Sequence, residues 1–161
     1  MNKKAIALGC GIAALAAVVV VAAIVIFFVY VSKDVEGVAV AVNGPTPVAV
    51  GEVCELEVVV TNERPRLPLK LSDIDIAENY LDGFTVCSVD PVPRSNKHVP
   101  IDNSRSFTFN VRVPARTAKT FKFKLRAEKA GIFRGDVDVC EGARFITGTA
   151  ETVVKAKGAT Q

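Results

Sequence analysis

Two pairs of aspartates at alternate positions are the residues of this 161-residue chain that are best suited to hold a cation. Asp73 and Asp75 form one Asp-x-Asp pair, and Asp136 and Asp138 form the other. If the two segments are neighbouring strands, their carboxylates meet on one face, where directly opposed like charges destabilise a sheet. A calcium ion, which binds oxygen ligands, would offset that repulsion, although the spacing matches no calcium-loop motif. The alternative countercharge comes from three basic residues: Lys70, Arg134 and Arg144.

Three basic residues alternate in a second segment: Lys122, Lys124 and Arg126. Glu55 and Glu57 alternate in an earlier one, so neighbouring strands would form a ladder of cross-strand ion pairs, each contributing roughly 0.2–1 kcal/mol. The other interpretation is an interaction surface, which Arg112 would join, for an anionic partner such as lipid headgroups or an envelope polymer. The sequence leaves both interpretations open.

The cysteines do not predict an internal disulfide. Outside the apolar N-terminal segment there are three, Cys54, Cys87 and Cys140, so one thiol is left over in any pairing. Cys54 begins its predicted strand and Cys140 ends its own, which places them at opposite ends of a sandwich, whereas a disulfide needs Cα atoms within about 7 Å. We therefore expect free thiols, with a bridge between two chains as the alternative.

The chain carries no recognisable catalytic motif, so we do not expect an enzyme. Its one histidine, His98, lies in a proline-flanked segment that we expect to be a solvated loop, and no serine stands in a G-x-S-x-G motif. There is neither the Cys and His spacing of a zinc site nor a Gly-rich phosphate loop, so no cofactor is expected. Two of the positive side chains behind the net charge of +3 are Lys3 and Lys4, and the nearly neutral remainder gives no long-range attraction to nucleic acid.

Alternating apolar residues predict about eight strands and an all-β fold. The expected strands are 37–42, 53–61, 69–76, 84–90, 107–113, 121–127, 132–140 and 145–154. The parity of apolar residues changes within 69–76, which predicts a bulge near Ser72. Residues 107–113 and 121–127 are expected to form a hairpin, residues 77–83 a turn or one helical turn, and residues 94–105 an exposed loop.

Strands of this number and spacing predict an antiparallel immunoglobulin-like β-sandwich. We expect one sheet to hold 37–42, 53–61, 107–113 and 121–127. The other is expected to hold 69–76, 84–90, 132–140 and 145–154. In this arrangement Asp73 and Asp75 lie beside Asp136 and Asp138.

The chain resembles the immunoglobulin-like surface modules of bacteria and archaea, of the CARDB and conserved-repeat type. The resemblance rests on Val50-Gly51-Glu52 leading into residues 58–62, on residues 81–84, and on the Val113-Pro114-Ala115 turn. It implies an extracytoplasmic scaffold or adhesion module without catalysis, present here in a single copy. A second resemblance, to membrane-tethered desiccation-associated proteins with one β-sandwich, would imply stress protection instead.

An uncharged apolar segment from Ala5 to Val31 precedes these strands. As a helix it would be about 40 Å long at ~1.5 Å per residue, against about 30 Å of bilayer hydrocarbon. Lys3 and Lys4 before it predict a cytoplasmic N-terminus and an extracytoplasmic domain, with a single pass through the membrane. A cleaved signal peptide is the alternative, but no A-x-A-like site follows Val31.

The predicted organisation is therefore a cytoplasmic stretch 1–4, a transmembrane signal anchor 5–31, a linker 32–36, a sandwich 37–154 and a polar tail 155–161. Gly9, Ala13 and Ala17 form a small-residue stripe on which a second membrane helix could pack. The expected function is a non-catalytic interaction or scaffold module anchored in the bilayer at the cell envelope. An accessory subunit of an envelope transport or secretion complex is the alternative, with a membrane-protein partner.

Overall fold

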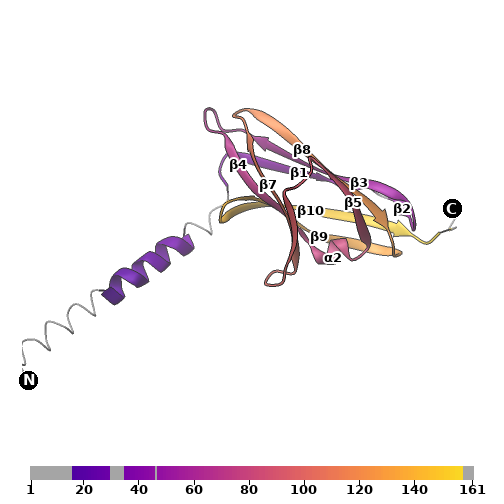
Figure 1. Cartoon of the computed structure of the whole chain (residues 1–161), viewed down its shortest axis with the longest axis horizontal. Coiled ribbons are helices and arrows are strands. Elements are labelled where there is room, and N and C mark those ends of the chain that lie inside the picture. The colour runs from indigo at the N-terminus through magenta and orange to yellow at the C-terminus, as the bar shows by residue number, and fades with distance from the viewer. Residues whose placement is uncertain (1–15, 30–34, 46, 158–161) are drawn as a thin grey trace, which may run out of the picture. The chain divides into compact units, whose positions relative to one another are not determined.

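The computed structural model describes residues 16–29, 35–45 and 47–157 (Figure 1). The chain divides into two compact units, Met1–Asp34 and Val35–Gln161. In the first unit, residues 16–29 form a helix whose large apolar side chains are exposed, from 49% at Ile24 to 68% at Ile26. Within the described ranges, no helix is both long and apolar enough to span a membrane. Much of the anchor predicted at 5–31 lies outside those ranges, as do Gly9 and Ala13, while Ala17 is in the helix and exposed.

The second unit is a β-sandwich in which ten strands of the described residues form two sheets (Figure 1). The four-stranded sheet has the order β1 (Val38–Asn43), β3 (Val53–Asn62), β8 (Thr117–Ala127), β5 (Phe84–Asp90). The six-stranded sheet has the order β2 (Val48–Ala49), β10 (Arg144–Lys155), β9 (Gly131–Glu141), β4 (Leu69–Ala77), β7 (Ser104–Val113), β6 (Ser95–Val99). A single helical turn, α2 (Glu78–Leu81), follows β4.

The core lies between the sheets and follows from the alternation of apolar residues. On β8, Phe121, Phe123 and Leu125 are fully buried, while the lysines between them face outward. Aromatic rings join the two layers, because Phe107 on β7 packs edge-to-face on Phe123 with ring centroids 5.1 Å apart. Such contacts stabilise the sandwich beyond the apolar area that they bury.

The prediction of an all-β sandwich and of a bulge at Ser72 is confirmed. The register of β4 against β7 shifts between Leu71 and Asp73, so both Leu71 and Ile74 point into the core despite their opposite parity. The predicted helical turn is α2.

The predicted placement of two strands is wrong. Residues 107–113 and 121–127 do not form a hairpin: β7 pairs with β4 and β6 in the six-stranded sheet, and β8 pairs with β3 and β5 in the other. The turn at Pro114–Arg116 therefore crosses between the sheets, and β5 takes the place expected for β7. The loop expected at 94–105 contains β6, which is polar because it is a half-exposed edge strand.

The sandwich has two ends, and the one that carries Val35 is called here the entry end. The loops 63–68, 114–116 and 142–143 belong to it, because β3, β7 and β9 terminate there. Asn62, which is fully buried, holds two of these loops together: its amide nitrogen donates to the carbonyls of Leu67 at 2.9 Å, Val113 at 3.0 Å and Pro114 at 3.1 Å. The opposite end carries α2 and the β6–β7 turn.

Candidate functional site

The four predicted aspartates lie on the outer face of the six-stranded sheet. Asp75 on β4 is directly opposite Asp138 on β9, and Asp73 is opposite Cys140. The Cys140 thiol donates to Asp75 Oδ2 at 3.7 Å, and the Thr147 hydroxyl donates to Asp138 Oδ1. The structure thus brings Asp75 and Asp138 together, as the sequence predicts.

The surroundings of these two carboxylates disfavour their ionisation. Burial is the first cause that raises the pKa of Asp75 and of Asp138, and neighbouring carboxylates, including Asp73 and Asp136, add to it. Asp75 Oδ1 is buried without a hydrogen-bond partner. Among the described residues, no group of three or more His, Cys, Asp or Glu side chains is arranged to hold a metal ion. The calcium site remains a prediction from the sequence.

The basic residues of β8 lie on the outer face of the four-stranded sheet. Glu57 is opposite Lys122 and Glu55 is opposite Lys124. The Lys122 ammonium contacts both carboxylates, at 2.8 Å to Glu55 and 3.1 Å to Glu57, and these hydrogen bonds raise the pKa of Lys122. The expected ion-pair ladder is present around Lys122, which leaves that lysine less available to an anionic partner.

The four residues of the predicted interaction surface do not share one face. Lys124 and Arg126 are exposed beside Lys122 on β8, but Arg112 lies on β7 in the other sheet, opposite Lys70. The prediction grouped Arg112 with the three basic residues of β8 because it assigned residues 107–113 to the same sheet as residues 121–127.

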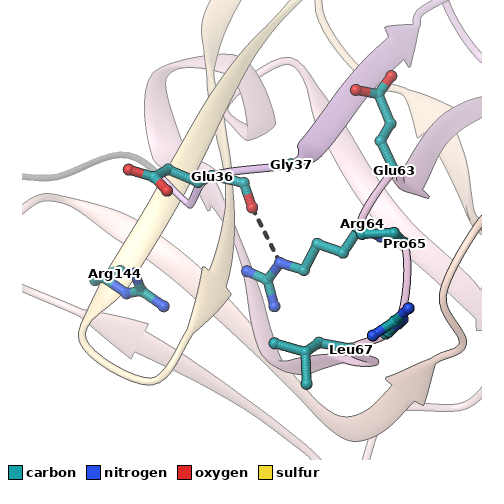
Figure 2. A pocket seen from close by; sticks show the side chains of 8 residues that line it. Glu36, Gly37, Glu63, Arg64, Pro65, Leu67 and Arg144 are labelled. Carbon is teal, nitrogen blue, oxygen red and sulfur yellow. Dashed lines mark hydrogen bonds between the residues drawn. The ribbon is translucent and has the colours of Figure 1, made fainter.

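A hollow of about 840 Å³ lies at the entry end, and of its lining residues the sequence analysis singled out only Arg144, as a countercharge to the aspartates (Figure 2). Its lining comprises Glu36, Gly37, Glu63, Arg64, Pro65, Arg66, Leu67 and Arg144. Arg64 extends across it, and its Nε donates to the backbone carbonyl of Glu36 at 3.0 Å (Figure 2). Gly37 is required here, because its φ is +67° and a Cβ would lie 2.9 Å from Arg64 Cγ.

Arg64 also forms a two-pronged ion pair with Glu141 at the end of β9. The distances are 3.1 Å from Nη1 to Oε1 and 2.7 Å from Nη2 to Oε2, and Arg144 contacts the same carboxylate at 3.1 Å. The hydrogen bond from Arg64 is the main cause that lowers the pKa of Glu141. Arg64 and Glu141 are 77 positions apart, so no local pattern could reveal the contact.

The described cysteines are free thiols, as expected. Cys87 is exposed, whereas Cys54 and Cys140 are partly buried, and burial raises the pKa of both thiols. His98 is not in a loop: it lies on β6, and its Nδ1 is 3.3 Å from Glu78 Oε1, which Arg105 also contacts.

Comparison with solved structures gives matches at low identity. A CARDB domain from Pyrococcus furiosus, solved in complex with di-metal ions, is 16% identical with a TM-score of 0.48, over 78% of this chain and 96% of that one. A cohesin module from a Clostridium perfringens family 33 glycoside hydrolase is 12% identical, with a TM-score of 0.48 over 78% and 100%. AvmM, which catalyses macrocyclisation in alchivemycin A biosynthesis, is 11% identical, with a TM-score of 0.48 over 79% and 93%.

No protein-family model matches the chain, and no curated protein matches it. The chain's own two sheets define its fold as a β-sandwich. The paired aspartates on the outer face of the six-stranded sheet and the arginines around the hollow are the two groups of charged side chains from which a binding site could be built.

Proposed function

We propose that this protein is a single-pass, membrane-anchored module whose β-sandwich lies outside the cytoplasm and acts by binding rather than by catalysis. The observation that carries the proposal is the uncharged segment Ala5–Val31, which joins the sandwich after only a few residues. In support, the large apolar side chains of helix 16–29 are exposed, which is costly in water and favourable in lipid.

Cys87 allows a direct test of the topology. It is the exposed thiol among the described cysteines, and Cys10 lies inside the proposed span. In intact spheroplasts treated with reductant, a membrane-impermeant maleimide should label the chain, and Cys87→Ser should lose most of the label. The chain should also remain with the membrane in alkaline carbonate. Labelling only after lysis would overturn the extracytoplasmic placement, and extraction by carbonate would overturn the anchor.

The second candidate is an accessory subunit of an envelope transport or secretion complex. It is favoured by a shallow apolar hollow of about 370 Å³ on the helix, lined by Ala17, Val18, Val21 and Ala22, where a second helix can pack. Cross-linking in intact cells, with a tag after Gln161, separates the two. One stoichiometric membrane protein would favour the subunit, and recovery of the chain alone would favour the free-standing module.

A further inference from the structure

We propose that the entry end of the sandwich docks on anionic lipid headgroups of the membrane in which the chain is anchored. The inference rests on the proposed membrane anchor and adds a second contact with the bilayer. The residues proposed to contact the lipid are four exposed cations, which we call the basic collar: Arg66, Lys70, Arg112 and Arg116.

The four cations of the basic collar come from segments that are distant in the sequence, and the fold brings them to one end of the sandwich. Lys70 and Arg112 are cross-strand partners on β4 and β7, one position from the entry end. Arg66 and Arg116 lie in the two loops that the Asn62 amide joins through the carbonyls of Leu67 and Pro114. Segments distant in the chain therefore present their cations at one end of the molecule.

The charge of the collar is not neutralised by the protein. None of its four side chains forms an ion pair with a described residue. Glu141, whose carboxylate accepts a hydrogen bond from the backbone amide of Lys70, is already bound by Arg64 and Arg144. Glu36 and Glu63 are the two carboxylates in the lining of the hollow, so cations are in excess at this end.

An apolar side chain accompanies the cations. Leu67 follows Arg66 at the rim of the hollow and is 67% exposed (Figure 2). An exposed leucine among arginines suits the membrane interface, where cations contact phosphates and the apolar side chain enters the headgroup layer.

The chain itself holds the collar close to the bilayer. Glu36 in the hollow is only five positions after Val31, the last residue of the apolar segment, and five extended residues span at most about 18 Å. Once anchored, the entry end meets the lipid surface at a high effective concentration, so a few weak contacts suffice. The high effective concentration therefore favours lipid as the partner over a molecule that diffuses freely.

A single tryptophan introduced at the rim of the hollow provides the test, because the chain has no tryptophan of its own. The full chain carrying Leu67→Trp is reconstituted in phosphatidylcholine vesicles with or without phosphatidylglycerol, both containing lipid brominated near the headgroup. We expect the fluorescence of the introduced indole to be quenched in the anionic vesicles and much less in the neutral ones. An Ile101→Trp variant at the opposite end, where the side chain is 96% exposed, should not be quenched in either.

Charge variants locate the effect. Changing any one collar cation to Gln should lower the ratio of docked to undocked chain by about fivefold at low salt. Raising the salt concentration should lower the same ratio in the parent chain, because salt screens the attraction between the cations and the lipid phosphates. A matched set of four exposed cations elsewhere, Lys97, Lys124, Arg126 and Lys129, changed to Gln should leave the quenching unchanged.

The two proposals fail in different ways. Quenching that is equal in neutral and anionic vesicles, or that survives loss of the whole collar, overturns the docking while carbonate-resistant vesicle association still supports the anchor. Loss of the chain from both kinds of vesicle in carbonate overturns the anchor, and the docking with it.

Discussion

The alternation of apolar and polar residues predicts some contacts between single residues and not others. The opposition of Asp75 and Asp138 follows from period-2 patterning once their strands are neighbours, and the structure places them so. The contact of Arg64 with Glu141 could not be predicted, because an arginine in an irregular loop carries no periodic signal and its partner lies at the end of a distant strand. Long-range polar contacts depend on which loops share an end.

The opposed aspartates should make the protein less stable as the pH rises. Their native pKa values are raised above the ordinary value of about 3.8, so the native state binds more protons than the unfolded state between the two values. The free energy of unfolding therefore falls as the pH rises through that window. Asp75→Asn removes one charge and should raise it at pH 7 by up to about 1 kcal/mol.

Urea unfolding of the detergent-solubilised chain between pH 4 and 7 measures this effect. Asp82→Asn is the matched control, because Asp82 forms an exposed pair with Lys129 that should contribute at most about 1 kcal/mol. A variant at Asp75 that is less stable than the parent at pH 7 would show that the carboxylate is favourable there.

The buried hydroxyl pair between Tyr80 and Thr152 offers a second prediction. The two oxygens are 3.0 Å apart and both residues are fully buried, and burial raises the pKa of Tyr80 to about 12. Tyr80→Phe leaves the Thr152 hydroxyl unpartnered and should cost about 1–3 kcal/mol. Adding Thr152→Val should recover most of that loss, because neither polar group remains. Chemical denaturation of the two single variants and the double variant measures the coupling, and simple additivity would contradict it.

At the scale of elements, the sequence predicts strands better than it predicts sheets. Eight expected strands are present, since each carries a clear alternation, whereas β2 has two residues and β6 lacks an apolar face. The exchange of β5 and β7 has a physical cause: alternation gives the buried side of a strand and not the sheet it joins. A short turn at Pro114–Arg116 looks the same whether it closes a hairpin or crosses the core.

The packing of β1 on β10 depends on a glycine. A Cβ on Gly148 would lie 2.6 Å from Val42 Cγ2, so the side chain of Val42 on β1 occupies the space that the glycine leaves. Gly148→Ala should cost about 1–3 kcal/mol through overpacking. Combining it with Val42→Ala should restore part of the loss, because the alanine then has room. Thermal unfolding of the four proteins of this cycle tests the contact, and the absence of coupling would exclude it.

At the scale of the whole molecule, the entry end combines a structural and a surface role. Arg64 links the start of the domain, through the Glu36 carbonyl, to the end of β9 through Glu141. The backbone amide of Glu63 also donates to the Gly37 carbonyl, at 2.9 Å. Because β1 is an edge strand that pairs only with β3 among the described strands, these contacts are needed to hold it in place.

Loss of the Arg64 contact should therefore loosen β1 before it unfolds the domain. Arg64→Lys keeps the charge but cannot reproduce the two-pronged bond to Glu141 or the bond to Glu36. We expect amide hydrogen exchange to accelerate in residues 35–43 and to stay slow in β8, whose apolar side chains are buried at the centre of its sheet. Arg66→Lys, in the same loop and without an ion pair to a described residue, should exchange like the parent. Equal acceleration throughout the sandwich would mean that Arg64 stabilises the whole fold rather than the start of the domain alone, since local opening exposes only the strand whose contacts were removed.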